Sequence, residues 1–68
     1  DKENLTKYFD MALSIVRKGG IIATDNLNYP EHYNKTMQEY VKHIRNNKKV
    51  QSVTVPIGNG EEITYKIR

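Results

Sequence analysis

The sequence predicts an α/β fold with the element order helix, strand, helix, strand, strand. Two stretches carry apolar residues at helical spacing, a short apolar run lies between them, and the last quarter alternates between apolar and polar residues. This order is typical of the second half of an open α/β sheet in which helices cover both faces. A chain of 68 residues is expected to contribute one small domain or part of one.

The first helix is expected from Asn4 to Lys18, because its apolar residues recur at spacings of three and four. Asn4 is a candidate N-cap. Arg17 and Lys18 suit the negative end of the helix, and Gly19-Gly20 offers the residue with positive φ that commonly closes a helix. The expected inward stripe consists of Leu5, Tyr8, Phe9, Ala12, Leu13, Ile15 and Val16.

A short apolar run, residues 21–24, follows the glycines and stops at Asp25-Asn26. Runs of this kind are typical of fully buried strands in parallel sheets. Such a strand needs more neighbours than two later strands can supply. We therefore expect the other neighbours to be provided either by another chain or by residues missing from this one.

The second helix is expected from about residue 31 to residue 47, with Pro30 at its first turn. Its inward residues would be Tyr33, Met37, Tyr40, Val41 and Ile44. The closing segment is expected to be two strands joined at Gly58-Asn59-Gly60. One alternating set is Val53, Val55 and Ile57, and the other is Ile63, Tyr65 and Ile67.

Composition excludes several classes of protein. The chain has no cysteine, which excludes a disulfide scaffold and a thiolate zinc site and fits a cytoplasmic protein. No apolar run approaches the roughly 20 residues of a membrane span, so no membrane association is expected. The net charge is +3, from 11 Lys and Arg against 8 Asp and Glu. Since these cations are spread along the chain, nucleic acid is an unlikely partner.

Asp25 and Asn26 are the strongest candidates for chemistry, because ligands bind outside the carboxyl ends of strands in open α/β sheets. A carboxylate beside a carboxamide suits Mg²⁺ or Ca²⁺. The competing interpretation is an ordinary turn, which Asp and Asn often form. His32 and His43 are too far apart on one helix to share a metal, so we expect solvated histidines.

Two segments together resemble a known family. The run DKENLTKYFDMALSIVRKGGIIATDN closely resembles a segment of the cation-dependent, S-adenosylmethionine-dependent O-methyltransferases of the catechol and caffeoyl-CoA type. The closing VTVPIGNGEEITYKI is similar to their terminal hairpin. The resemblance implies that residues 1–68 are a C-terminal fragment of a single methyltransferase domain. Its fold would be the C-terminal part of a class I Rossmann-like methyltransferase, with an incomplete sheet.

The same resemblance implies roles for individual residues. Asp25 and Asn26 match two metal ligands, Lys2 matches the base that deprotonates the acceptor, and Asp1 is assigned to cofactor binding. The implied cofactors are S-adenosylmethionine and Mg²⁺ or another divalent cation. The implied partners are a small hydroxylated, catechol-like acceptor and further copies of the chain in a homo-oligomer.

Two departures from the family pattern bear on these roles. The third metal ligand and the glycine-rich cofactor loop would lie upstream of Asp1, so the isolated chain is expected to be inactive. Only Leu27-Asn28-Tyr29 separates Asn26 from Pro30, where the family has a longer insertion that shapes the acceptor pocket.

Two other interpretations of the whole chain stay open. One is a small basic α/β module that binds nucleic acid or a protein through the segment from Lys42 to Lys49. The other is a structural piece that self-associates through an unpaired strand edge.

Overall fold

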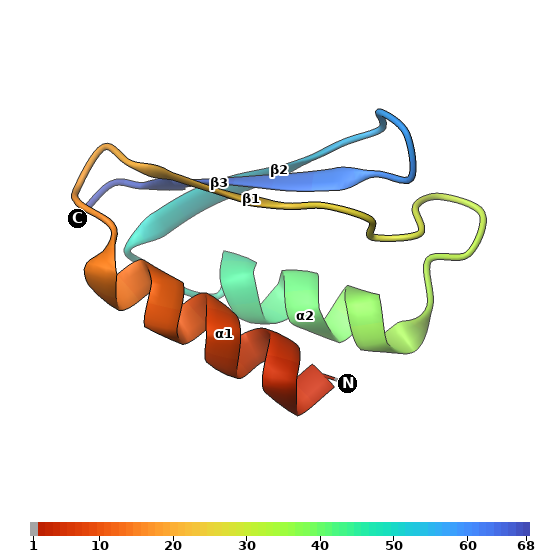
Figure 1. Ribbon diagram of the computed structural model, residues 1–68, viewed down its shortest axis with the longest axis horizontal. Helices are drawn as coiled ribbons and strands as arrows, with labels where there is room; N and C mark the ends of the chain where they lie inside the picture. Colours follow the sequence, from red (N-terminus) through yellow and green to blue (C-terminus); the bar gives the residue numbers. More distant parts are fainter. Residues whose placement is uncertain (1) are drawn as a thin grey trace.

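The computed structural model describes residues 2–68, and every side chain in that range except that of Lys2. The predicted element order is confirmed: α1 (Lys2–Ile15), β1 (Ile21–Thr24), α2 (Lys35–Arg45), β2 (Val50–Val55) and β3 (Glu61–Lys66). Both helices lie on the same side of the sheet (Figure 1). The expectation that helices cover both faces is therefore wrong for the described chain, which forms two layers.

β3 is the central strand of a three-stranded sheet with the order β1-β3-β2. It pairs antiparallel with both neighbours, and Thr64 lies opposite Ile22 on β1 and Ser52 on β2. β1 and β2 therefore point in the same direction, with α2 in the connection between them. The expectation of a fully buried strand in a parallel sheet is wrong here. β1 is an edge strand within residues 2–68, and Ile21 is 62% exposed.

α1 begins before Asn4 and ends at Ile15, so Asn4 is not its N-cap and the helix is shorter at its C-terminus than predicted. Gly19 has a φ of 88°, as expected of the residue that reverses the chain. Arg17 and Lys18 lie beyond the helix. A cation from β3 is at the helix end instead: Lys66 Nζ donates to the carbonyl oxygens of Leu13 at 2.8 Å and Val16 at 2.7 Å.

α2 is shorter at both ends than the predicted range of residues 31–47. Its N-cap is Asn34, whose Oδ1 accepts a hydrogen bond from the Met37 amide at 2.9 Å. Pro30 follows a cis peptide bond in the preceding turn and is not part of the helix. Because a capping side chain satisfies an amide of the first turn, Asn34 marks the helix start more directly than Pro30.

The core lies between the helices and the sheet. Phe9 of α1 meets Tyr40 of α2 edge to face, with ring centroids 6.3 Å apart. Tyr8 and Ile15 are 66% and 85% exposed, so their predicted places in the inward stripe are wrong. None of the helices found in residues 2–68 is both long and apolar enough to span a membrane. The buried apolar residues are Phe9, Leu13, Leu27, Tyr40, Val41, Ile44 and Val50.

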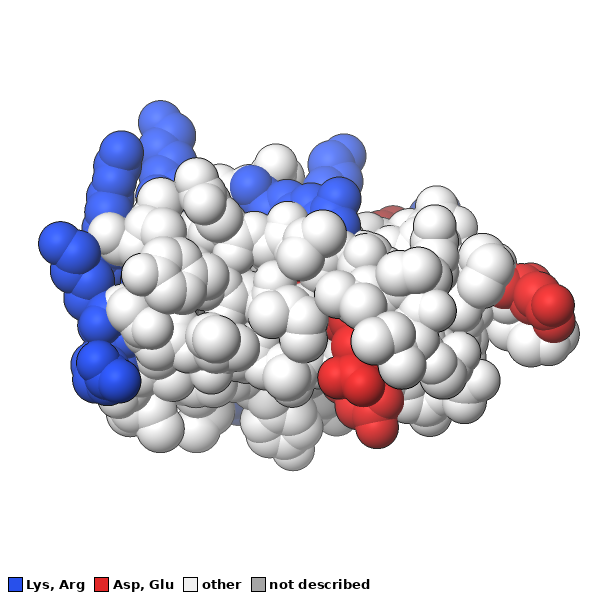
Figure 2. Space-filling model, turned by 90° about the horizontal axis from the view of Figure 1, so that it is seen from above, with Lys and Arg blue, Asp and Glu red and all other residues white. Residues whose placement is uncertain are grey.

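In the hairpin, apolar side chains are exposed and polar side chains are buried, which is the reverse of the usual distribution. Val53 and Tyr65, from the alternating apolar sets, are 56% and 45% exposed. Glu62 and Thr64, the polar residues between them, are buried. The view onto the sheet from above shows a largely uncharged surface, with Lys and Arg gathered toward one end (Figure 2). Within the described chain, the apolar sets of the hairpin thus lie on the face away from the helices.

Candidate functional site

Asp25 and Asn26 directly follow the last residue of β1, and both are exposed. The N-terminal end of α1 lies at this same end of the molecule along its long axis (Figure 1). Residues at the carboxyl end of β1 and at the start of α1 thus lie toward the same end of the long axis, in different layers of the fold (Figure 1). Of the two, the strand end is where a ligand is expected to bind in an open α/β sheet.

The loop after β1 has an uncommon backbone. Asn26 and Asn28 have φ values of 62° and 60°, in the left-handed region that asparagine tolerates better than most residues. Leu27 lies between them and is fully buried in the core. In this loop, the buried side chain of Leu27 therefore lies between two asparagines in the left-handed conformation.

Two backbone hydrogen bonds join this loop to the turn between β2 and β3. The amide of Leu27 donates to the carbonyl oxygen of Gly60 at 3.0 Å, and the amide of Tyr29 donates to that of Asn59 at 2.9 Å. Gly60 has a φ of 87°, and a Cβ there would lie 2.7 Å from Tyr29 Cβ. Glycine is required at this position by both the backbone angle and the close approach.

The strand end itself is tied to α2. Thr24 Oγ1 lies 2.8 Å from Tyr40 Oη, a hydrogen bond in which either hydroxyl can donate. Burial raises the pKa of the Tyr40 phenol, the hydrogen bond from Thr24 lowers it, and the nearby Glu62 charge raises it, with a net shift upward. The Tyr40 phenol is therefore protonated at neutral pH, and its hydroxyl can donate or accept the hydrogen bond with Thr24.

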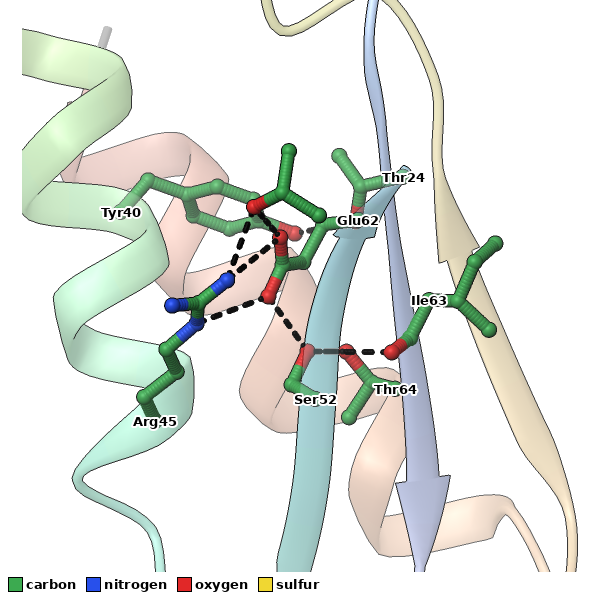
Figure 3. Close-up of polar contacts among 8 residues, drawn as sticks. Thr24, Tyr40, Arg45, Ser52, Glu62, Ile63 and Thr64 are labelled. Atoms are coloured by element: carbon green, nitrogen blue, oxygen red, sulfur yellow. Dashed lines mark hydrogen bonds and ion pairs between the residues drawn. The ribbon is translucent and has the colours of Figure 1, made fainter. Parts of the chain in front are cut away.

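A polar cluster between α2 and the hairpin is the feature that the sequence did not indicate (Figure 3). The Glu62 carboxylate is fully buried and accepts from Arg45 Nε at 3.1 Å. The hydroxyls of Ser52 and Thr54 donate to it at 2.6 Å and 2.5 Å. Ser52 Oγ also lies 2.7 Å from Thr64 Oγ1. The sequence pattern could have indicated this cluster, because its hairpin residues all lie on the parity opposite to the apolar residues. They are Ser52, Thr54, Glu62 and Thr64.

Asp25 and Asn26, the candidate metal ligands, would supply only part of a coordination shell. No group of three or more His, Cys, Asp or Glu side chains that could hold a metal occurs among residues 2–68. Asp25 and Asn26 offer two accessible hard oxygens, which fit two of the six or more ligands that Mg²⁺ or Ca²⁺ takes. Any remaining ligands must come from water, from an acceptor or from other residues.

The other predicted site residues are only partly described. Lys2 is the first residue of α1, and its side chain lies outside the described atoms. Asp1, assigned to cofactor binding, lies outside the described residues.

The two histidines are exposed, as expected, but they are not on one helix as predicted, because His32 lies in the turn before α2. His43 Nε2 lies 2.8 Å from Asp10 Oδ1, so this histidine links the two helices. That contact was missed because the two residues are 33 positions apart.

The hollows of the surface do not center on the Asp25–Asn26 pair. One of about 220 Å³ lies beside the loop, lined by residues 28–32 with Gly58 and Asn59. A larger one, about 650 Å³, lies between the ends of the helices and includes Asp10 and His43. Within the described chain, Asp25 and Asn26 line neither of them, so they are surface groups at the rim of the loop.

Comparison with known proteins identifies the family. A sequence model of the O-methyltransferase family matches residues 1–67, which is nearly the whole chain. The chain therefore belongs to the O-methyltransferase family, and a function in methyl transfer is supported. A search of curated proteins found no significant match.

Proposed function

We propose that residues 1–68 are the C-terminal part of a single Rossmann-like methyltransferase domain of the cation-dependent catechol and caffeoyl-CoA type. The domain would transfer a methyl group from S-adenosylmethionine to a hydroxyl of a small catechol-like acceptor. The family match supports the reaction class. Two strands pointing in the same direction, linked through α2 on one face, support a Rossmann-like origin.

The observation that carries the proposal is the Asp25–Asn26 pair at the carboxyl end of β1. Both side chains are exposed, while the residues on either side of the pair are anchored by Tyr40 and by Gly60. Rigid neighbours are what a binding site requires of its supporting residues. An ordinary surface turn does not need its two flanks fixed to separate elements.

The proposed roles follow from the chemistry of each group. The Asp25 carboxylate and the Asn26 amide oxygen would hold a divalent cation and orient the acceptor beside them. A cation bound there would stabilise negative charge on the acceptor oxygen. Lys2 Nζ would accept the hydroxyl proton, and Asp1 would contribute to cofactor binding. The position of the α1 N-terminus at the same end of the fold supports the assignment of Lys2 (Figure 1).

The experiment is a metal titration of the 68-residue chain followed by nuclear magnetic resonance. Mn²⁺ broadens the signals of nuclei near it, so a paramagnetic titration detects even weak binding. We expect the amide signals of Asp25 and Asn26 to broaden first, and the Asp25→Ala variant to lose this effect. Broadening that is strongest at Asp10 or at Glu61, or equal at all acidic residues, would contradict the proposed site.

A second assay tests the proposal that the chain is a fragment. We expect the 68-residue chain to show no methyl transfer from S-adenosylmethionine to catechol in the presence of Mg²⁺. Clear turnover by this chain alone would overturn the fragment proposal.

A second candidate function rests on the distribution of charge. Gly19 N donates to Lys66 O at 2.7 Å, and Ile67 N donates to Lys49 O at 2.8 Å. These bonds bring three segments together at the end of the molecule opposite to Asp25, where Lys and Arg gather (Figure 2). The exposed cations on these segments are Arg17, Lys18, Lys48, Lys49 and Arg68.

A cluster of this kind supports binding of a polyanion such as nucleic acid. Binding of a single-stranded oligonucleotide should then weaken steeply as salt rises from 50 to 200 mM, as is usual for phosphate contacts. Absence of binding at about 50 mM salt would exclude this candidate.

Oligomeric state and location are further parts of the proposal. A homo-oligomer is supported by the exposed Val53 and Tyr65 on the outer face of the sheet. A cytoplasmic location is supported by the absence of cysteine from the sequence.

A further inference from the structure

We infer that Thr24 and Tyr40 are positioning residues that direct the Asp25–Asn26 pair toward a divalent cation. This inference rests on the proposed function and adds two residues to it. Neither is a candidate metal ligand. Both would act through the backbone that carries the ligands.

One anchor of the pair lies at the end of β1. Thr24 is the last residue of β1 and directly precedes Asp25. Its hydroxyl lies 2.8 Å from Tyr40 Oη. Tyr40 is only 4% exposed, and its ring packs edge to face against Phe9. The strand end is therefore tied to a side chain that the core holds in place.

A second anchor lies on the other side of the pair. Leu27 is fully buried, and its amide donates to Gly60 O at 3.0 Å. Asp25 and Asn26 thus occupy a two-residue span between two fixed points, one set by α2 and one by the β2–β3 turn. Because Asn26 has a φ of 62°, this short span turns sharply, and a shift of either anchor changes the direction of both side chains.

The anchor at Thr24 is a hydrogen bond and not an apolar contact. An apolar contact at Thr24 would bury this strand end but would not define its rotation or its distance from α2. A hydrogen bond between two hydroxyls does both, because its strength depends on distance and angle. Residues that support metal ligands commonly act in this way, and their loss reduces metal affinity without removing a ligand.

The test compares two substitutions of Thr24 in the 68-residue chain. Thr24→Val removes the hydroxyl at nearly constant shape, and Thr24→Ser keeps it. We expect Thr24→Val to weaken Mn²⁺ binding at Asp25 and Asn26 about fivefold, the factor that corresponds to one typical hydrogen bond. Thr24→Ser is expected to restore affinity to within about twofold of the unaltered chain.

Thr64→Val is the matched control. Thr64 is buried whereas Thr24 is half-buried, and the Thr64 hydroxyl likewise lies close to another hydroxyl, 2.7 Å from Ser52 Oγ. The control should lower stability, because it also removes a buried hydroxyl partner, while leaving Mn²⁺ affinity unchanged. A second readout needs no metal: ¹⁵N relaxation of the Asp25 and Asn26 amides should show increased motion in Thr24→Val and not in Thr64→Val.

The outcomes separate this inference from the proposed function. If the unaltered chain binds no Mn²⁺ at Asp25 and Asn26, the metal assignment is wrong and the inference falls with it. If the chain binds Mn²⁺ there, but Thr24→Val weakens binding no more than Thr64→Val does, only the positioning role is overturned. Failure of Thr24→Ser to restore binding would also overturn it.

Discussion

The guanidinium of Arg45 lies 3.1 Å from the carboxylate of Glu62, and the two side chains are exposed to very different degrees. Glu62 is fully buried, whereas 47% of the Arg45 side chain is accessible. Arg45 therefore reaches from the surface of α2 to a charge beneath it (Figure 3). Within the described chain no buried side-chain nitrogen or oxygen is without a hydrogen-bond partner, so the pair closes a complete polar cluster.

The Arg45→Met substitution tests the contribution of this pair to stability. It retains much of the apolar stem and removes the charge, leaving Glu62 with hydroxyl partners only. We expect the free energy of unfolding in urea to fall by about 2 kcal/mol. Adding Glu62→Gln should recover part of this loss, because the buried group is then neutral.

Lys42→Met is the control for the loss of a cation from α2, since Lys42 is exposed. We expect it to change the free energy of unfolding by less than about 0.5 kcal/mol. Equal effects of Arg45→Met and Lys42→Met would show that the Glu62 contact contributes nothing to stability.

Lys66 is expected to stabilise the end of α1. Its ammonium donates to the carbonyl oxygens of Leu13 and Val16, and the last turn of α1 contains no basic residue of its own. Lys66→Met should therefore destabilise the chain by about 1–2 kcal/mol. It should also speed amide hydrogen exchange at Val16, whose N–H donates to the Ala12 carbonyl oxygen at 3.0 Å. Lys48→Met, an exposed lysine, is the control, and identical exchange at Val16 in both variants would contradict this role.

Leu27 is expected to be the most sensitive apolar position of the loop after β1, because it is fully buried. Leu27→Ala should lower the free energy of unfolding by roughly 2–5 kcal/mol. In so small a chain that loss is expected to populate the unfolded state at 25 °C, as measured by far-ultraviolet circular dichroism. Ile15→Ala is the matched control because Ile15 is 85% exposed, and it should cost less than about 1 kcal/mol. A comparable loss in both variants would mean that Leu27 is not an anchor.

Alkaline pH should destabilise the fold through its two shielded phenols. Burial and the Glu62 charge raise the pKa of Tyr33, although Arg45 opposes the shift, and burial is also the largest cause of the raised pKa of Tyr40. A raised folded pKa means that the folded chain holds these protons more tightly than the unfolded chain does. The resulting stability is complete below pH 10.0, the ordinary value, and is lost as pH rises through the folded pKa.

Urea unfolding between pH 8 and pH 12 measures this dependence. The Tyr40→Phe variant removes one of the two phenols, so its stability should fall less steeply above pH 10.0 than that of the unaltered chain. The control is Tyr8→Phe, because Tyr8 is 66% exposed. An unchanged slope in Tyr40→Phe would contradict the role of this phenol.

The helical stripes were predictable because they depend on local spacing. Phe9 and Leu13 in α1, and Tyr40 and Ile44 in α2, are buried as their periodicity indicated. Which face of the hairpin the helices cover was not predictable in the same way. Alternation defines two faces but does not say which one the helices cover, and here Glu62 faces inward because Arg45 and two hydroxyls satisfy it.

The placement of the candidate residues in the fold, though not their role, was predictable in part for a similar reason. The position of Asp25 and Asn26 at a strand end follows from a short apolar run and the polar residues after it. The bond between Thr24 and Tyr40 joins residues 16 positions apart, and no local pattern indicates it. The start of α2 could have been predicted, since Asn34 belongs to a residue type favoured at the N-cap, but Pro30 suggested an earlier start.

The central position of β3 has a consequence for how the chain acquires its structure. Both strand ladders of the described sheet use β3, and β1 and β2 do not pair with each other. During synthesis from the N-terminus, α1, β1, α2 and β2 all leave the ribosome before the strand on which every ladder depends. The two ladders of the described sheet can therefore form only after β3 has been made, and the polar cluster around Glu62 forms in the same late step.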